Sequence, residues 1–164
     1  DQYIVKAKEL TEKTIQLFFD TTDGFFFYSS KSDLIARKKE VFDNVTSSSN
    51  SMMARNLILL GEILEVEEWI SMAQKMIESL NHVIKGELNY AGNWGMAAME
   101  LLHGRKELIL TGKNVKQTKE DLQQHFLPFT FFAQASDTSI LPMAHGREMP
   151  ESDLKVYVCY QKTC

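Results

Sequence analysis

The 164-residue chain has few cysteines, no long apolar run and no excess of positive charge. Its two cysteines, Cys159 and Cys164, lie within the last six residues and cannot staple a fold of this length, so the chain is not a disulfide scaffold. No apolar run approaches the roughly 18 residues that a membrane helix needs, so no membrane partner is expected. With 18 basic and 22 acidic residues, a net charge of −4 and no basic stripe with interleaved aromatics, nucleic acid is not an expected partner either.

Motifs for metal binding and for dithiol chemistry are also missing. The four histidines have no second histidine or cysteine at metal-ligand spacing, and no C-x-x-C occurs. We therefore expect no metal and no cofactor. The chain starts at Asp1, with no initiator methionine and no basic-then-apolar leader, and we interpret it as a trimmed or proteolytic piece of a larger cytoplasmic protein.

Helical periodicity dominates the first two thirds of the chain. Apolar residues recur with three-four spacing and predict four main helices, at 2–19, 51–64, 66–84 and 91–103. In 2–19, residues Ile4, Ala7, Leu10, Leu17 and Phe18 are expected on the inner face. The helix at 51–64, capped by Ser49 or Asn50, is apolar around most of its circumference, which predicts burial on most sides. One neighbouring helix cannot cover it, so we expect further hairpins or a homodimer to do so.

Short apolar runs replace this spacing after Gly104. We expect strands at 107–111, 129–133 and 155–159, with a helix at 115–126 between the first two. Strand, helix and strand in this order suggest a parallel, right-handed β-α-β unit. The predicted fold is therefore mainly α, with helical hairpins over 1–104 and a small α/β tail over 105–164. Earlier in the chain, the aromatic run at 25–28 has strand character.

A long polar segment interrupts the helical part. Residues 29–50 lack a convincing period apart from an expected helical turn at 33–36, and a polar loop of about 20 residues is often functional. Its chemistry-bearing side chains are Arg37, Lys39, Glu40, Asp43 and Asn50. Arg37 could bind a carboxylate, a phosphate or a polyhydroxylated ligand, and the two carboxylates could act as acid or base or hold sugar hydroxyls. We expect at least three of the five to face one concavity; the alternative is that the charges pair and brace the loop.

Two stretches resemble one known family. Residues 34–51 are similar to the R-P-K-E-x-x-D-G-x-x-P-S-G-N-S stretch of YyaL-type thioredoxin-domain proteins, which are relatives of the spermatogenesis-associated thioredoxin-like protein. Residues 156–159 with Cys164 are similar to that family's A-Y-V-C-x-x-x-x-C. The first motif is retained at Arg37, Lys39, Glu40, Asp43, Ser48, Asn50 and Ser51. The family has proline where this chain has Lys38 and Ser47, and glycine where it has Asn44 and Ser49.

The resemblance implies an N-terminal thioredoxin-like domain followed by an (α/α) toroid like that of N-acylglucosamine 2-epimerases and six-hairpin glycosidases. This chain would be the end of the toroid with its α/β tail, and its partners would be the missing hairpins and the thioredoxin-like domain.

Two functions follow from this resemblance. In the first, the intact toroid binds a carbohydrate-like ligand, and could act as an epimerase, isomerase or glycosidase, with Arg37, Lys39 and Asn50 as ligand contacts and Glu40 and Asp43 as catalytic candidates. In the second, the toroid is a non-catalytic binding or scaffold module that serves the redox domain. The cysteine pair could form a disulfide, bind a metal with partners elsewhere, or stay as free thiols.

Overall fold

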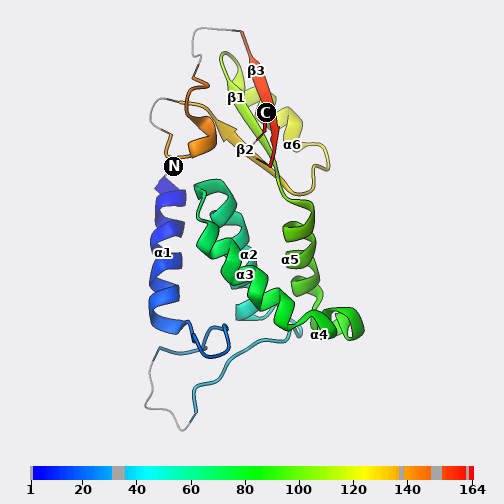
Figure 1. Cartoon of the computed structure of the whole chain (residues 1–164). Helices are drawn as coiled ribbons and strands as arrows, with labels where there is room; N and C mark the ends of the chain where they lie inside the picture. Colours follow the sequence, from blue (N-terminus) through cyan, green and yellow to red (C-terminus); the bar gives the residue numbers. More distant parts are fainter. Residues whose placement is uncertain (1, 31–35, 137–138, 149–152, 162) are drawn as a thin grey trace. The chain divides into compact units, whose positions relative to one another are not determined.

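The computed structural model describes residues 2–30, 36–136, 139–148, 153–161 and 163–164. The chain divides into two compact units, a helical unit over residues 2–102 and a second unit that begins at His103 (Figure 1). Helices come first and a small sheet comes last, which confirms the mainly helical fold with a short α/β tail that the sequence predicts. No helix within the described ranges combines the length and the apolar character that a membrane span requires.

The helical unit contains five α-helices and one short 3-10 helix among its described residues. These are α1 (Gln2–Phe18), α2 (Ser49–Leu64), α3 (Glu67–Ser79), α4 (Asn81–Gly86), η1 (Leu88–Tyr90) and α5 (Gly92–His103), the last of which runs up to the unit boundary. The expected helical turn at 33–36 falls almost wholly outside the described residues.

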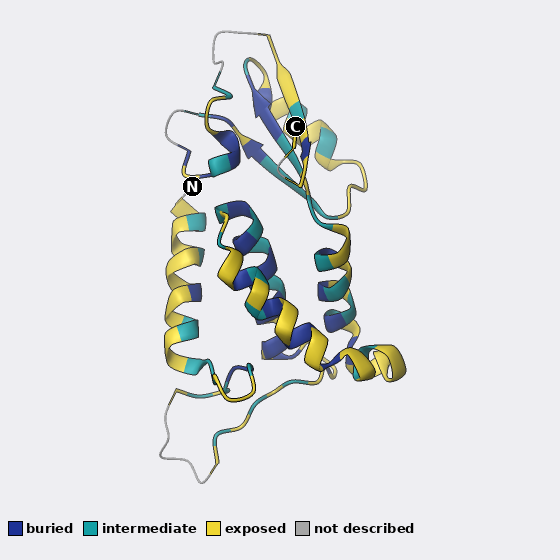
Figure 2. Cartoon of the chain, in the orientation of Figure 1, coloured by how far each residue is buried: buried dark blue, intermediate teal, exposed yellow. Residues whose placement is uncertain are grey.

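Helix α2 is the centre of the helical unit. Nine of its sixteen residues are buried, which confirms the expected burial on most sides (Figure 2). Its N-cap is Ser48, one residue earlier than expected, and the Ser48 side chain accepts a hydrogen bond from the Ser51 N–H. Helix α3 crosses α2 closely at Gly61, where an added Cβ atom would lie 2.7 Å from Cγ1 of Ile70. Glycine therefore sets the distance between the two helices.

The helix predicted at 66–84 is instead two helices. It breaks at Leu80, whose N–H bonds the carbonyl of Ile77 in a tight three-residue turn. The Ser79 hydroxyl, which donates to the Met76 carbonyl at 2.8 Å, competes with the regular helical bond. The periodicity continues across the break because the buried Leu80 keeps its place on the inner face.

The inner face predicted for the first helix is wrong in part. Leu10 and Leu17 are 54% and 48% exposed, whereas the buried residue of α1 is Thr11. Figure 2 shows that most of α1 is exposed, so only a narrow stripe packs inward. The aromatic run after α1 also forms no regular strand, because it is held by one isolated antiparallel bridge between Phe19 and Phe26.

The second unit is a three-stranded sheet with the order β2-β1-β3. Its elements are β1 (Lys106–Thr111), α6 (Val115–Gln123), β2 (Thr130–Gln134), η2 (Pro142–Ala144) and β3 (Lys155–Tyr160). Strands β1 and β2 are parallel and are joined through α6, as the expected β-α-β unit requires. Strand β3 pairs with β1 in the antiparallel direction, with Glu107 opposite Cys159, so the sheet is mixed.

Candidate functional site

Asn50 joins three segments of the helical unit and has no exposed surface. Its side-chain oxygen accepts from the Phe26 N–H at 2.7 Å, and its amide nitrogen donates to the carbonyls of Phe26 at 2.9 Å and Glu40 at 2.8 Å. This arrangement imitates a strand pairing between the aromatic run and the start of α2. The residue expected as a ligand contact therefore has its amide occupied by the backbone of its own chain.

Asp43 is also buried, and both of its carboxylate oxygens have donors. One oxygen accepts from the Ser48 N–H at 2.8 Å and from the Ser51 hydroxyl at 2.7 Å. The other accepts from the N–H of Asn93 at 2.8 Å, across fifty residues of sequence. This candidate acid or base thus ties the loop to the first turns of α2 and α5.

A polar network extends from Asp43 through residues that the sequence analysis did not single out. The Asn93 amide donates to the Ser51 hydroxyl at 2.9 Å, and Arg55 donates to the Asn93 side-chain oxygen at 2.9 Å. Arg55 also pairs with the buried Glu100 at 2.6 Å. Arg55 lies 38 residues before Asn93 and 45 residues before Glu100, so no local spacing could have linked it to these two residues of α5.

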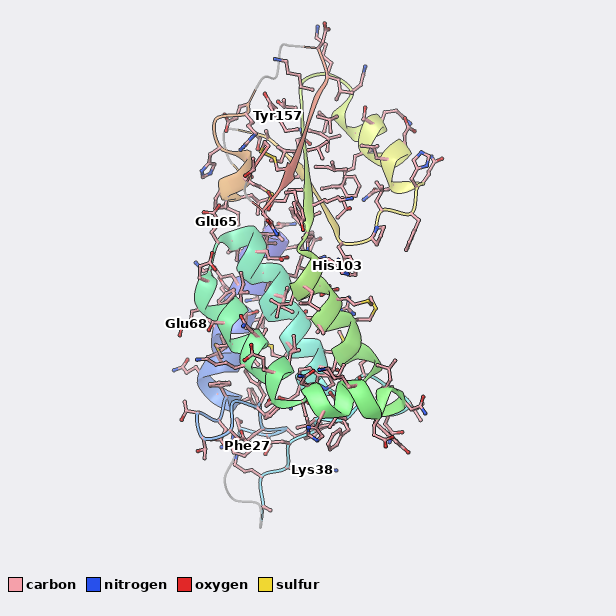
Figure 3. All side chains as sticks on the ribbon, turned by 45° about the vertical axis from the view of Figure 1, so that its right-hand side comes forward. Phe27, Lys38, Glu65, Glu68, His103 and Tyr157 are labelled. Atoms are coloured by element: carbon pink, nitrogen blue, oxygen red, sulfur yellow. A yellow bond between two sulfur atoms is a disulfide. The ribbon has the colours of Figure 1, made fainter. Side chains whose placement is uncertain are left out.

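Arg37 and Lys39 share one aromatic ring. The Arg37 guanidinium carbon lies 3.7 Å from the centroid of the Phe27 ring, and the Lys39 Nζ atom lies 4.2 Å from it. Arg37 also donates to the carbonyl of Ser29, through Nη2 at 2.8 Å. Figure 3 labels Phe27 and Lys38, the residue between the two cations in sequence, at the loop end of the helical unit. The cation–π contact orders both cations on the chain's own surface.

Lys39 additionally bridges two carboxylates of the turn after α1. Its Nζ atom lies 2.6 Å from Asp20 Oδ2 and 2.6 Å from Asp23 Oδ1. The hydrogen bond from Lys39, together with donors of Thr22, lowers the pKa of Asp20 from 3.8 to about 2. Burial lowers the pKa of Lys39, but the hydrogen bonds to the two aspartates outweigh it and raise the pKa above its usual value. Both shifts favour the ionised forms of Asp20 and Lys39.

Glu40 is the candidate with the least engaged side chain. It is exposed, and its Oε2 atom accepts from the Ser49 N–H at 3.4 Å, a long hydrogen bond. Its backbone carbonyl, by contrast, is fixed by Asn50. The five candidates thus divide between a cation pair on Phe27, two separate buried networks and an exposed carboxylate. That at least three of them face one concavity stays a prediction.

A hollow of about 260 Å³ lies on the same unit, between α1, the aromatic run and α2. None of the five candidates lines it. The lining is mostly apolar and aromatic, with three polar members, and consists of Thr14, Phe18, Phe26, Phe27, Tyr28, Ser49, Met52, Met53 and Asn56. Tyr28 is 69% exposed, so its ring is accessible to a ligand in or beside the hollow.

In the second unit, Cys159 and Cys164 are joined by a disulfide, with their Cα atoms 4.0 Å apart. Of the three states that the sequence left open, the structure has the first. No group of three or more histidine, cysteine, aspartate or glutamate residues within the described ranges is arranged to hold a metal ion.

Comparison with known proteins adds no relative: no family model matches the chain, and no curated protein and no solved structure matches it significantly.

Proposed function

We propose that the chain is a non-catalytic binding or scaffold module. One observation carries the proposal: the two most deeply placed candidates, Asp43 and Asn50, have all their side-chain oxygens engaged by donors of the chain itself. A general acid or base must reach the proton that it transfers, within about 3 Å or through one water. A buried carboxylate with three internal donors holds the loop in place instead.

The exposed stripe of α1 supports a role in assembly. Tyr3, Leu10 and Leu17 are spaced by seven residues, which places them on one helix face, and all three are exposed. The partner that we propose for this stripe is a further helical hairpin of the same protein, as the resemblance to YyaL-type thioredoxin-domain proteins suggests. Leu10→Gln together with Leu17→Gln should abolish co-purification with the remainder of the protein expressed as a separate chain. Unchanged co-purification would exclude the stripe as the contact.

Two carboxamide variants test the scaffold proposal in the intact protein. Asp43→Asn should lower the free energy of unfolding by about 1–3 kcal/mol, because a buried hydrogen-bonded acceptor is altered. Glu40→Gln, the matched change at an exposed carboxylate of the same loop, should change neither stability nor binding. If Glu40→Gln abolished a ligand-dependent activity and left stability unchanged, the loop would be catalytic and the proposal would be wrong.

A carbohydrate-like ligand is the second candidate, and the hollow favours it. Exposed aromatic rings next to amide and hydroxyl groups suit sugars, because the ring packs on C–H groups while the polar side chains bond hydroxyls. Tyr28 with Asn56, Ser49 and Thr14 has this character. Titration of neutral mono- and disaccharides, followed by NMR, tests it: Tyr28→Ala should weaken binding at least fivefold, whereas Tyr90→Ala, at another exposed tyrosine of the unit, should not. No chemical-shift change with any sugar would remove this candidate.

A further inference from the structure

The disulfide in the second unit is strongly asymmetric. Cys159 lies on β3 and has no exposed surface, whereas Cys164 is exposed. Between them, Tyr160 and Thr163 exchange two backbone hydrogen bonds, of 2.8 and 3.0 Å, which turn the chain back on itself. Residue Cys159 is thus shielded from solvent, whereas residue Cys164 is accessible to it.

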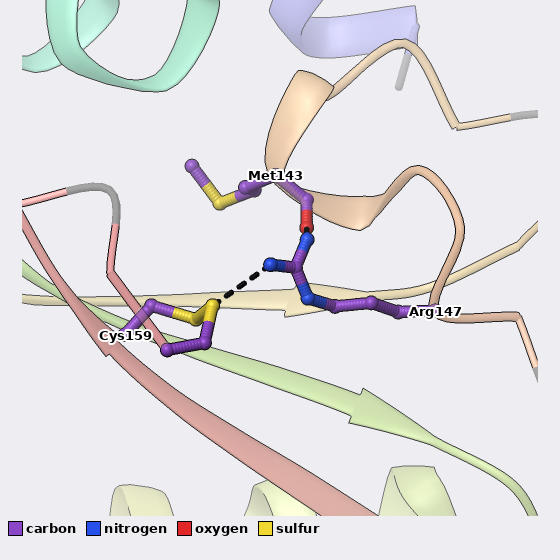
Figure 4. The surroundings of a disulfide bond; sticks show 4 residues. Met143, Arg147 and Cys159 are labelled. Atoms are coloured by element: carbon purple, nitrogen blue, oxygen red, sulfur yellow. Dashed lines mark hydrogen bonds between the residues drawn. A yellow bond between two sulfur atoms is a disulfide. The ribbon is translucent and has the colours of Figure 1, made fainter.

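A cation lies directly beside the sulfur atom of the exposed residue Cys164. The Nη2 atom of Arg147 is 2.8 Å from the Sγ atom of Cys164 (Figure 4). Arg147 is fixed in this position by a hydrogen bond from Nη1 to the Met143 carbonyl, and its guanidinium carbon lies 5.7 Å from the centroid of the Tyr157 ring. A guanidinium beside a sulfur atom stabilises the thiolate, which is the reactive form in thiol chemistry.

The disulfide contributes little to the stability of the fold. It links residues only five apart, and the entropy lost by the unfolded chain on cross-linking is least for short loops. Strand β3 is already held by β1 over six paired positions, from Lys106 with Tyr160 to Thr111 with Lys155. An exposed disulfide that the fold does not need is the kind that exchanges readily.

We propose that Cys164 and Cys159 form a redox-active pair that exchanges with small thiols and disulfides, with Cys164 as the reacting sulfur, Cys159 as the resolving one and Arg147 as the stabiliser of the Cys164 thiolate. This activity goes beyond the scaffold role and is located in the other unit of the chain.

A low-molecular-weight disulfide is the oxidant that forms the Cys159–Cys164 bond. In the reduced chain, the Cys164 thiolate attacks one sulfur of this disulfide, its S–S bond breaks, and the first small thiolate leaves. The Cys159 thiol then loses its proton and attacks Sγ of Cys164, which releases the second small thiolate and forms the bond seen in the structure. The two thiol protons of the chain end on the two leaving thiols. The reverse sequence, started by a small thiol at the exposed Cys164, reduces the pair.

Trapping of the mixed disulfide tests the order of attack. The reduced full chain is mixed with oxidised glutathione, and mass spectrometry follows the adduct. Cys159→Ser should accumulate glutathione on Cys164, while Cys164→Ser should form its adduct at least tenfold more slowly, because its remaining thiol is buried. Equal rates in the two variants, or no adduct in either, would overturn the proposal.

The role of Arg147 is tested with iodoacetamide, a neutral reagent that the guanidinium does not attract. In a Cys159→Ser background, Arg147→Gln should slow alkylation of Cys164 about tenfold, the change expected for loss of one unit charge 2.8 Å from the sulfur in a water-like medium. Arg147→Lys keeps the charge and should keep most of the rate. If the Gln and Lys variants are equally slow, Arg147 only shapes the corner, and its part in the proposal fails.

Discussion

Replacement of Asn50 by alanine would distinguish whether the loop is architectural or binds a ligand. The side chain makes three hydrogen bonds, two to Phe26 and one to the Glu40 carbonyl. The Phe26 backbone groups have no other hydrogen-bond partner in the described part of the chain, and the residue is 3% exposed, so water cannot easily replace the amide. The Glu40 carbonyl belongs to an exposed residue and can be hydrated.

The expected cost follows from these two orphaned groups. An unsatisfied buried backbone donor or acceptor costs about 1–3 kcal/mol, so loss of both partners of Phe26 should lower the free energy of unfolding by about 4 kcal/mol. A domain of this kind is stable by about 5–15 kcal/mol in total, so the change would be large. Asn50→Asp should lower the free energy of unfolding at least as much, because its second oxygen would face two carbonyls where an N–H₂ group now donates.

Tryptophan fluorescence during urea unfolding is the natural assay. Both tryptophans of the chain, Trp69 and Trp94, are buried in the helical unit, so the signal reports that unit alone. Asn56→Ala, an exposed position on the same helix, is the matched control and should change the free energy of unfolding by less than about 0.5 kcal/mol. We call the three hydrogen bonds of the Asn50 side chain to Phe26 and Glu40 the clamp. If Asn50→Ala lowered the free energy of unfolding by less than about 1 kcal/mol, the clamp would be refuted and the amide would be free for a ligand.

Two further changes probe the same unit. Because the folded-state pKa of Asp20 is about 2, the stabilisation from its ionised form is complete above about pH 4 and is lost as the pH falls towards 2. The difference in urea midpoint between the wild type and Lys39→Met should therefore shrink over this range. A difference that stays constant would exclude the ion pair as its cause. Gly61→Ala should cost about 1–3 kcal/mol in the same assay, because the new Cβ atom overlaps Ile70, whereas Gly86→Ala has open space and should be neutral.

The sequence predicts this fold well where periodicity is strong and local. Three-four spacing locates α2 and α5 to within two residues, and short apolar runs locate the three strands. It fails where packing decides: α1 has apolar residues around much of its circumference, so the pattern alone could not show that Thr11 and not Leu10 would be buried. The antiparallel direction of β3 could not be predicted, because the sequence between β2 and β3 carries no direction signal.

The candidate site shows a different limit. Charge and loop length single out residues 29–50, but residue type cannot tell whether a carboxylate will contact a ligand or the backbone of its own chain. For Asp43 the answer depends on Asn93, fifty residues away, whose N–H is oriented by the first turn of α5. Such a partner becomes visible only after α2 and α5 are packed together.

The bonding pattern also gives a physical reason for the loop residues on which the proposed resemblance to YyaL-type proteins rests. Of its retained positions, Asp43, Ser48, Asn50 and Ser51 are those whose side chains form the clamp and the cap of α2. Glycine at the positions of Asn44 and Ser49 is not demanded by the backbone here, because neither residue has a positive φ. A loop that keeps its bonding residues and loses its glycines retains what a scaffold needs. We therefore propose that the relation to that family is one of architecture and not of reaction.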